Sequence, residues 1–203
     1  PAEFEVRGLT ATELHKAMEA GARQGSVESI VKAITSSGDQ ATAIRKALGL
    51  YANLRPVKPH RATLGASPVK PHLLNGVDLV VVRENLEGLY IGHEHYVQID
   101  DDPHAVAMAT GINTRAGCRH ILEYAFEHAI ATGRKKVTLV HKANIMKALT
   151  GIFKETGEQM YEQQYKGRIQ RDTVIVDACA MKLVLNPWQF DVLVTTNLFG
   201  DIL

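Results

Sequence analysis

The chain has 203 residues, of which 45% are hydrophobic and 22% charged, values typical of globular proteins. Its formal net charge of +1 does not favour binding to nucleic acid or to an acidic partner. No apolar run approaches the length of a membrane span, and the opening PAEFEVRG does not have the form of a signal peptide. We therefore expect a cytoplasmic protein with one large or two small domains, in which Cys118 and Cys179 are buried, reduced thiols.

Two arginines lie ten residues apart in the segment IRKALGLYANLRPVK. Asp39 begins a predicted helix that carries Arg45 and ends at Gly49, and Arg55 lies on a following strand. Because the planar fork of arginine binds a carboxylate through two hydrogen bonds, the pair could converge on one anion. Taken singly, each arginine is more often a surface charge.

Arg83 follows a predicted strand, Val77 to Val82, and Tyr90 lies a few residues later in RENLEGLY. Ligands bind at the carboxyl ends of strands in open α/β sheets, so Arg83 is a candidate for binding a ligand. A tyrosine beside cationic groups can donate a proton, although a core tyrosine with a satisfied hydroxyl is the more common case.

The segment from Ile91 to Ala109 is polar and predicted to be irregular, with a turn at Asp100 to Pro103. His93 and His95 form an H-x-H pair without a third metal ligand in view, so no metal site is expected there. Thr114 then begins a long predicted helix that ends at Gly133.

The stretch VTLVHKANIMK places polar residues at a junction between a strand and a helix. Val137 to Val140 predicts a buried strand, and apolar spacing from Ile145 predicts a helix to about Tyr165. Lys142 and Asn144 lie between the two. A lysine that is partly desolvated at such a position can move protons, whereas a solvated lysine in a surface turn is the alternative.

Two aspartates follow the last predicted strands. Asp177 comes directly after Thr173 to Val176, and Asp201 lies beyond Phe190 to Thr196. Carboxylates from adjacent strand ends could hold Mg²⁺ or Mn²⁺, which prefer oxygen ligands, although Asp177 could instead be the N-cap of a helix. The strands together predict an α/β protein whose sheet is flanked by helices.

Several of these motifs, in the same order, resemble the isocitrate/isopropylmalate dehydrogenase family. The sequences of these motifs are most similar to those of isocitrate dehydrogenases of the NAD type. The resemblance covers about Arg45 to Leu203 and is carried by IRKALGLYANLRPVK, RENLEGLY, VTLVHKANIMK and VDACAMKLVLNPWQFDVLVTTNLFGDIL.

The resemblance implies part of the large domain in residues 1–50 and most of the small domain in residues 51–87 and 115–203. Residues 88–114 would be a clasp-like dimerisation segment. It also implies a homodimer with shared active sites, in which Lys142 and Asp177 work in trans with the residues Arg45, Arg55, Arg83 and Tyr90.

The implied reaction is the metal-dependent oxidative decarboxylation of isocitrate to 2-oxoglutarate, a step of the tricarboxylic acid cycle, with hydride transfer to NAD or possibly NADP. By resemblance, Lys142 and Tyr90 are catalytic, and Asp177 and Asp201 bind Mg or Mn. The remaining site residues would be Thr35 for the cofactor and, for the 2-hydroxy acid substrate, Arg45, Arg55, Arg83 and Asn144.

The chain departs from the family pattern in two places. Lys32 to Ser36, which contains Thr35, resembles a family loop without its prolines, and Asp39 and Ala41 stand where isocitrate enzymes usually have serine and asparagine. Homoisocitrate, isopropylmalate and tartrate therefore stay open as substrates. The family sequence also continues beyond Leu203, so the chain resembles an enzyme that is incomplete at both ends, and a non-catalytic regulatory subunit or an inert fragment is the alternative of another class.

Overall fold

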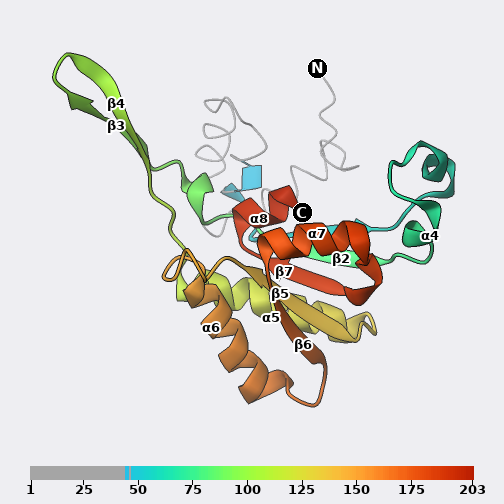
Figure 1. Ribbon diagram of the computed structural model, residues 1–203. Coiled ribbons are helices and arrows are strands. Elements are labelled where there is room, and N and C mark those ends of the chain that lie inside the picture. Colours follow the sequence, from blue (N-terminus) through green and yellow to red (C-terminus); the bar gives the residue numbers. More distant parts are fainter. Residues whose placement is uncertain (1–43, 46) are drawn as a thin grey trace, which may run out of the picture. The chain divides into compact units, whose positions relative to one another are not determined.

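The computed structural model describes Ile44, Arg45 and residues 47–203 (Figure 1). The chain divides into two compact units, residues 1–50 and 51–203, and each is described by itself. In the first unit, Ile44, Arg45 and Ala47 are helical, and Gly49 has a φ of 62°, which confirms the predicted end of that helix. The predictions for Thr35, Asp39, Ala41 and the rest of residues 1–43 lie outside the described residues.

The second unit is built on a five-stranded sheet in the order β1-β2-β7-β5-β6. Four strands are parallel, namely β2 (Leu79–Glu84), β7 (Val192–Thr195), β5 (Lys136–His141) and β6 (Gln170–Ile175). β1 (Ala52–Val57) pairs antiparallel with β2 at one side. The carboxyl ends of the four parallel strands therefore share one edge of the sheet, where α/β proteins bind ligands.

Helices cover both faces of this sheet, which confirms the predicted α/β class. α5 (Arg115–Ala131) and α6 (Gly151–Met160) pack against the face that carries Val80 and Val82. α7 (Val176–Leu185) and α8 (Asn197–Ile202) pack on the opposite face, with Leu79 and Val81 (Figure 1). Both faces are apolar because the parallel strands are buried on both sides. Fully burying each such side chain stabilises the fold by about 1.5–3 kcal/mol.

The predicted start and end of one helix, and the predicted C-terminal end of another, are confirmed. Thr114 is the N-cap of α5 and its hydroxyl accepts from the Gly117 amide, while Gly133, with a φ of 69°, follows the end of that helix. α6 continues as the π-helical turn η4 (Tyr161–Tyr165), and Gly167, with a φ of 83°, ends it. Cys118 and Cys179 are buried, free thiols, as expected.

The predicted start of the helix at Ile145 is wrong, because α6 begins only at Gly151. Residues 143–150 form turns, and the Thr150 hydroxyl binds the Lys142 amide and the Met146 carbonyl, which holds them in that shape. Ile145 is 72% exposed, so its apolar spacing did not report a buried face.

The prediction of an irregular segment between Ile91 and Ala109 is also wrong. β3 (Glu94–Ile99) and β4 (Asp102–Ala109) form an antiparallel hairpin, with Asp100 at the predicted turn and a φ of 50°. Every residue of both strands is exposed, and Figure 1 shows the hairpin extending away from the five-stranded sheet.

Short helices make up the remaining elements: η2 (Arg61–Ala66), α4 (Pro71–Leu74), η3 (Leu89–Ile91) and η5 (Pro187–Gln189). In the described part of the chain, no helix has both the length and the apolar character needed to cross a membrane.

Candidate active site

Asp201 gathers side chains from three other elements at the carboxyl edge of the sheet. Arg83 at the end of β2 places Nη1 2.5 Å from Asp201 Oδ1, and Arg55 of β1 places Nη2 3.1 Å from the same oxygen. Tyr90 of η3 donates its hydroxyl to Oδ2 at 2.8 Å. The structure therefore brings together four of the residues that the sequence predicts to be functional.

The contacts in this cluster shift the pKa values of Asp201 and Tyr90 and stabilise their charge states. The hydrogen bond from Tyr90, followed by that from Arg55, lowers the pKa of Asp201. The same bond to Asp201 raises the pKa of Tyr90, with partial burial adding to the effect, so the phenol keeps its proton. The Arg83 guanidinium also lies 5.2 Å from the centroid of the Tyr90 ring, within the range of a cation–π interaction.

Asn197 is a member of the cluster that the sequence analysis did not single out. Its Oδ1 accepts from Arg83 Nε at 3.0 Å and from Nη2 at 2.6 Å, and its Nδ2 donates to the Glu87 carbonyl at 3.1 Å. The available signal was a polar residue directly after a buried strand, at the edge where ligands bind.

Two glutamates hold the loop that carries Tyr90. The Glu84 carboxylate accepts from the amides of Leu86 and Glu87 at 2.8 and 2.9 Å, and burial raises the pKa of Glu84. The Glu87 carboxylate accepts from the amide and the hydroxyl of Thr114 at 2.7 and 2.6 Å, which ties the loop to the start of α5. The two glutamates of RENLEGLY therefore hold the loop that leads to Tyr90.

Lys142 and Asp177 form a second cluster, at the ends of the neighbouring strands β5 and β6. Lys142 Nζ lies 2.5 Å from Asp177 Oδ1, and this hydrogen bond lowers the pKa of Asp177. The alternative reading of Asp177 as an N-cap is wrong, because Ile175 is the N-cap of α7 and Asp177 lies in its first turn.

The turn that carries Lys142 is held by its neighbours. His141 Nδ1 accepts from the Ala143 amide at 3.1 Å, and Thr150 Oγ1 accepts from the Lys142 amide at 3.2 Å. Burial, followed by the charge of Lys154, lowers the pKa of His141, which keeps Nδ1 free to accept. Asn144 is exposed in the same turn and, among the described residues, makes no side-chain hydrogen bond to either cluster.

The two aspartates do not follow adjacent strands, so that expectation is wrong. β5 lies between β6, which precedes Asp177, and β7, which precedes Asp201. Each carboxylate belongs to its own cluster, and the described residues contain no group of three or more His, Cys, Asp or Glu placed to hold a metal ion. Their oxygens suit Mg²⁺ or Mn²⁺, but each offers a single carboxylate.

Two further predicted site residues do not belong to the second unit. Arg45 lies in the first unit, on the helical turn before Gly49, and Thr35 lies outside the described residues.

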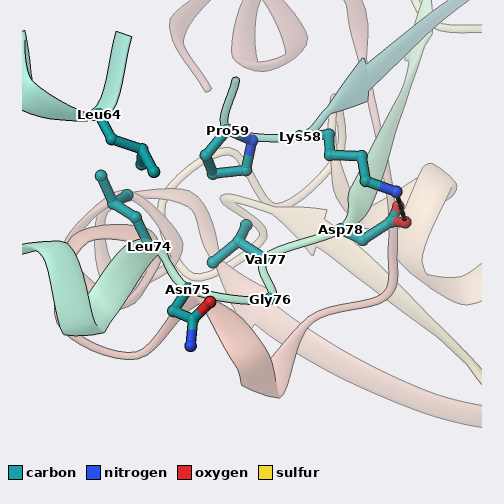
Figure 2. Close-up of a pocket in the computed structure, with 8 residues that line it drawn as sticks. All are labelled: Lys58, Pro59, Leu64, Leu74, Asn75, Gly76, Val77 and Asp78. Atoms are coloured by element: carbon teal, nitrogen blue, oxygen red, sulfur yellow. Dashed lines mark hydrogen bonds and ion pairs between the residues drawn. The ribbon is translucent and has the colours of Figure 1, made fainter. Parts of the chain in front are cut away.

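A separate cavity of about 290 Å³ lies where β1 ends and β2 begins. Figure 2 shows the Lys58–Asp78 ion pair, 3.0 Å long, beside it. Arg134 also binds the Asp78 carboxylate, at 2.6 Å, so this charge is already neutralised. The cavity contains none of the predicted site residues; it is lined by Lys58, Pro59, Leu64, Leu74, Asn75, Gly76, Val77 and Asp78.

Comparison with known proteins gives one consistent family. The family model described as isocitrate/isopropylmalate dehydrogenase matches residues 9–203. Homoisocitrate dehydrogenase of Methanocaldococcus jannaschii is 39% identical over 163 residues, which are 79% of this chain and 44% of that protein. Isocitrate dehydrogenase [NADP] of Thermus thermophilus is 38% identical over an alignment that covers 100% of this chain and 41% of that protein.

A solved structure agrees with the sequence comparisons. The crystal structure of isocitrate dehydrogenase from Methylococcus capsulatus superposes with a TM-score of 0.73 at 44% sequence identity, covering 82% of this chain and 46% of that one. The chain thus spans less than half the length of these relatives.

Proposed function

Because this chain belongs to the isocitrate/isopropylmalate dehydrogenase family, we propose that the protein oxidises and decarboxylates a 2-hydroxy acid, with isocitrate as the first candidate and NAD or NADP as hydride acceptor. The observation that carries the proposal is the cluster of Arg55, Arg83 and Tyr90 around Asp201. NAD is the first candidate acceptor, because the sequences HKANIMK and TTNLFGDIL are more similar to those of NAD-using enzymes.

The arginines are suited to bind the substrate carboxylates. Arg55 and Arg83 lie side by side on the paired strands β1 and β2, and both reach the same oxygen of Asp201. Each guanidinium presents several parallel N–H groups, the geometry that a carboxylate accepts in pairs. Arg45 and Asn144 are proposed as further substrate contacts, and Thr35 as a cofactor contact.

The proton transfers fall to Lys142 and Tyr90. Lys142 removes the proton of the substrate hydroxyl while the carbon that bears this hydroxyl transfers hydride to the nicotinamide. Tyr90, which its bond to Asp201 keeps protonated, then protonates the carbon that lost CO₂. A Mg²⁺ or Mn²⁺ ion held by Asp177 and Asp201 would supply Lewis-acid stabilisation of negative charge on the substrate oxygen.

A homodimer with shared active sites would reconcile the two clusters. Asp177 and Asp201 follow strands that are not neighbours, so we propose that Lys142 and Asp177 of one chain meet Arg55, Arg83 and Tyr90 of another. In this proposal residues 88–114 are the dimerisation segment, residues 1–50 belong to the large domain, and residues 51–87 and 115–203 to the small domain.

The hairpin β3–β4 supports this assembly. A two-stranded hairpin is marginally stable alone in water, and this one exposes Tyr96, Ile99 and Met108 by 61, 53 and 48%. A second copy of the same hairpin would cover these apolar side chains.

Other substrates and another class remain as alternatives. Asp39 and Ala41 favour testing homoisocitrate, isopropylmalate and tartrate, and one of the relatives above is named for homoisocitrate. A non-catalytic regulatory subunit or an inert fragment is the alternative of another class. The presence of Lys142, Tyr90, Asp177 and the arginines favours catalysis.

The test is nicotinamide reduction by the full-length gene product. NAD and NADP are each offered with Mn²⁺ and with isocitrate, homoisocitrate, isopropylmalate or tartrate, and reduction is followed at the nicotinamide absorbance. We expect turnover with isocitrate. Turnover with another acid alone would correct the substrate, and no turnover with any acid by a folded protein would overturn the proposal.

A further inference from the structure

The side chain of Asn197 connects Arg83 to the loop that leads from Glu87 to Tyr90. It is 1% exposed and is the first residue of α8, separated from β7 only by the N-cap Thr196. Its oxygen accepts both Nε and Nη2 of Arg83, at 3.0 and 2.6 Å, and its nitrogen donates to the Glu87 carbonyl at 3.1 Å. The amide oxygen of Asn197 therefore binds Arg83, and the amide nitrogen of the same side chain binds the loop at Glu87.

The contact with Arg83 fixes one edge of the guanidinium. Because Asn197 takes Nε and Nη2, the Nη1 corner is the one that reaches Asp201, at 2.5 Å. The stem of Arg83 is confined too, since a Cβ added at Gly200 would lie 2.5 Å from Arg83 Cγ. The Arg83 side chain is only 3% exposed, so the guanidinium has little freedom to turn.

The contact with Glu87 fixes the loop. Glu87 precedes Gly88, whose φ of 81° turns the chain into η3, the short helix that carries Tyr90. A change in the direction of the Glu87 carbonyl would therefore move Tyr90 relative to Asp201.

We propose that Asn197 is a positioning residue that aims Arg83 at the carboxylate of an anionic ligand and sets the position of Tyr90. It touches neither substrate nor cofactor and acts through these two groups. The catalytic part of this inference rests on the proposed function, whereas the arrangement of Arg83 can be tested without any substrate.

Two substitutions separate the roles. Asn197→Asp keeps an oxygen for Arg83 but sets a second oxygen against the Glu87 carbonyl, and an acidic residue in the first turn of a helix is favourable for folding. Asn197→Leu removes both contacts. Thr138→Val is the matched control, because Thr138 is fully buried on β5 and its hydroxyl has no hydrogen-bond partner among the described residues.

The first measurement is the modification of arginines by a dicarbonyl reagent on the full-length protein, quantified by peptide mass spectrometry. Arg83 should react more slowly than Arg55 in the wild type, in Asn197→Asp and in Thr138→Val. In Asn197→Leu its reaction should speed up roughly tenfold or more, because hydrogen bonds from a charged donor are lost. Equal protection of Arg83 in Asn197→Leu, or loss of protection in Asn197→Asp, would overturn the proposal.

The second measurement is the split between KM and kcat. Asn197→Leu should raise KM for the acid roughly tenfold or more through Arg83 and, because the Glu87 contact is also lost, should lower kcat as well. Asn197→Asp should lower kcat through Tyr90 with KM nearly unchanged. If Asn197→Leu does not fold, Asn197→Ser, whose hydroxyl is too short to span the same gap, carries the same expectation. The modification pattern without turnover of any acid would uphold the positioning role and reject the proposed function, and wild-type kinetics in all variants would do the reverse.

Discussion

Lys142 Nζ lies 2.5 Å from Asp177 Oδ1, across the ends of the neighbouring strands β5 and β6. Lys142→Met removes the proposed acceptor of the hydroxyl proton, so kcat should fall by about 10²–10⁴-fold. The melting temperature should stay near that of the wild type, because exposed ion pairs contribute little to stability. Lys166→Met, which breaks the exposed pair with Glu162, is the control and should alter neither quantity. Near wild-type kcat in Lys142→Met would reject the role of Lys142.

Tyr90→Phe should also lower kcat, by about 10²–10⁴-fold, because it removes the proposed proton donor to carbon. Tyr90 is 39% exposed and its hydroxyl donates to Asp201 at the edge of the sheet, so loss of this hydroxyl should hardly change the thermal unfolding curve. Steady-state turnover and circular dichroism check the two expectations. A variant that is folded and fully active would show that another group protonates the product.

His141→Asn should weaken the pH dependence of stability. The pKa of His141 is lowered in the folded protein by burial and by Lys154, with Glu158 opposing, so the unfolded chain takes up this proton first as the pH falls. The stability associated with neutral His141 is therefore present above its ordinary pKa and is lost below it. An asparagine oxygen accepts the Ala143 amide at any pH. Melting temperatures measured between about pH 7 and about pH 5 should fall less in the variant, and identical slopes would contradict this.

Arg134→Met should destabilise the protein by about 1–2 kcal/mol. Arg134 donates to the carbonyl and the carboxylate of Asp78, both at 2.6 Å, and to Asp191 at 3.0 Å, joining the starts of β2 and β7. The pKa of Asp78 is lowered by Arg134 first and Lys58 next, so this stability is present above the ordinary pKa of the carboxyl and is lost as the pH falls through the folded value. Denaturant unfolding at neutral and at acidic pH should show a smaller difference between variant and wild type under acidic conditions.

Val106→Glu should weaken dimerisation if β3–β4 is the dimerisation segment. Val106 pairs with Val97 on the exposed hairpin, so a charge there would be buried by a second copy at a cost of roughly 3 kcal/mol or more. Analytical ultracentrifugation should show dissociation at concentrations where the wild type and the control Glu155→Lys, exposed on α6, remain dimers. An unchanged dimer would remove the hairpin from the interface.

The sequence predicted those features that local signals determine. Val137 to Val140 is a β-branched run inside β5, and Thr114 and Gly133 mark the ends of α5. Arg55, Arg83, Tyr90 and Asp201 were expected to be functional, and the structure brings them into contact.

The remainder depends on long-range packing. The position of β5 between β6 and β7 is a property of the whole sheet, and nothing near Asp177 or Asp201 in the chain reports it. The hairpin β3–β4 has no buried face, so it lacks the alternation that identifies a half-buried strand. Asn197 was missed because its partners, Arg83 and Glu87, lie more than a hundred residues away.

The Asp201 carboxylate is already shared by Arg55, Arg83 and Tyr90. An anionic substrate that binds Arg55 and Arg83, as proposed above, would take the place of Asp201, so the number of ion pairs would change little. Such an exchange is favourable when a positive ion takes the oxygens that Arg55 and Arg83 give up. In this proposal the anion and the cation would promote each other's binding, and thermodynamic linkage would make that promotion equal in both directions.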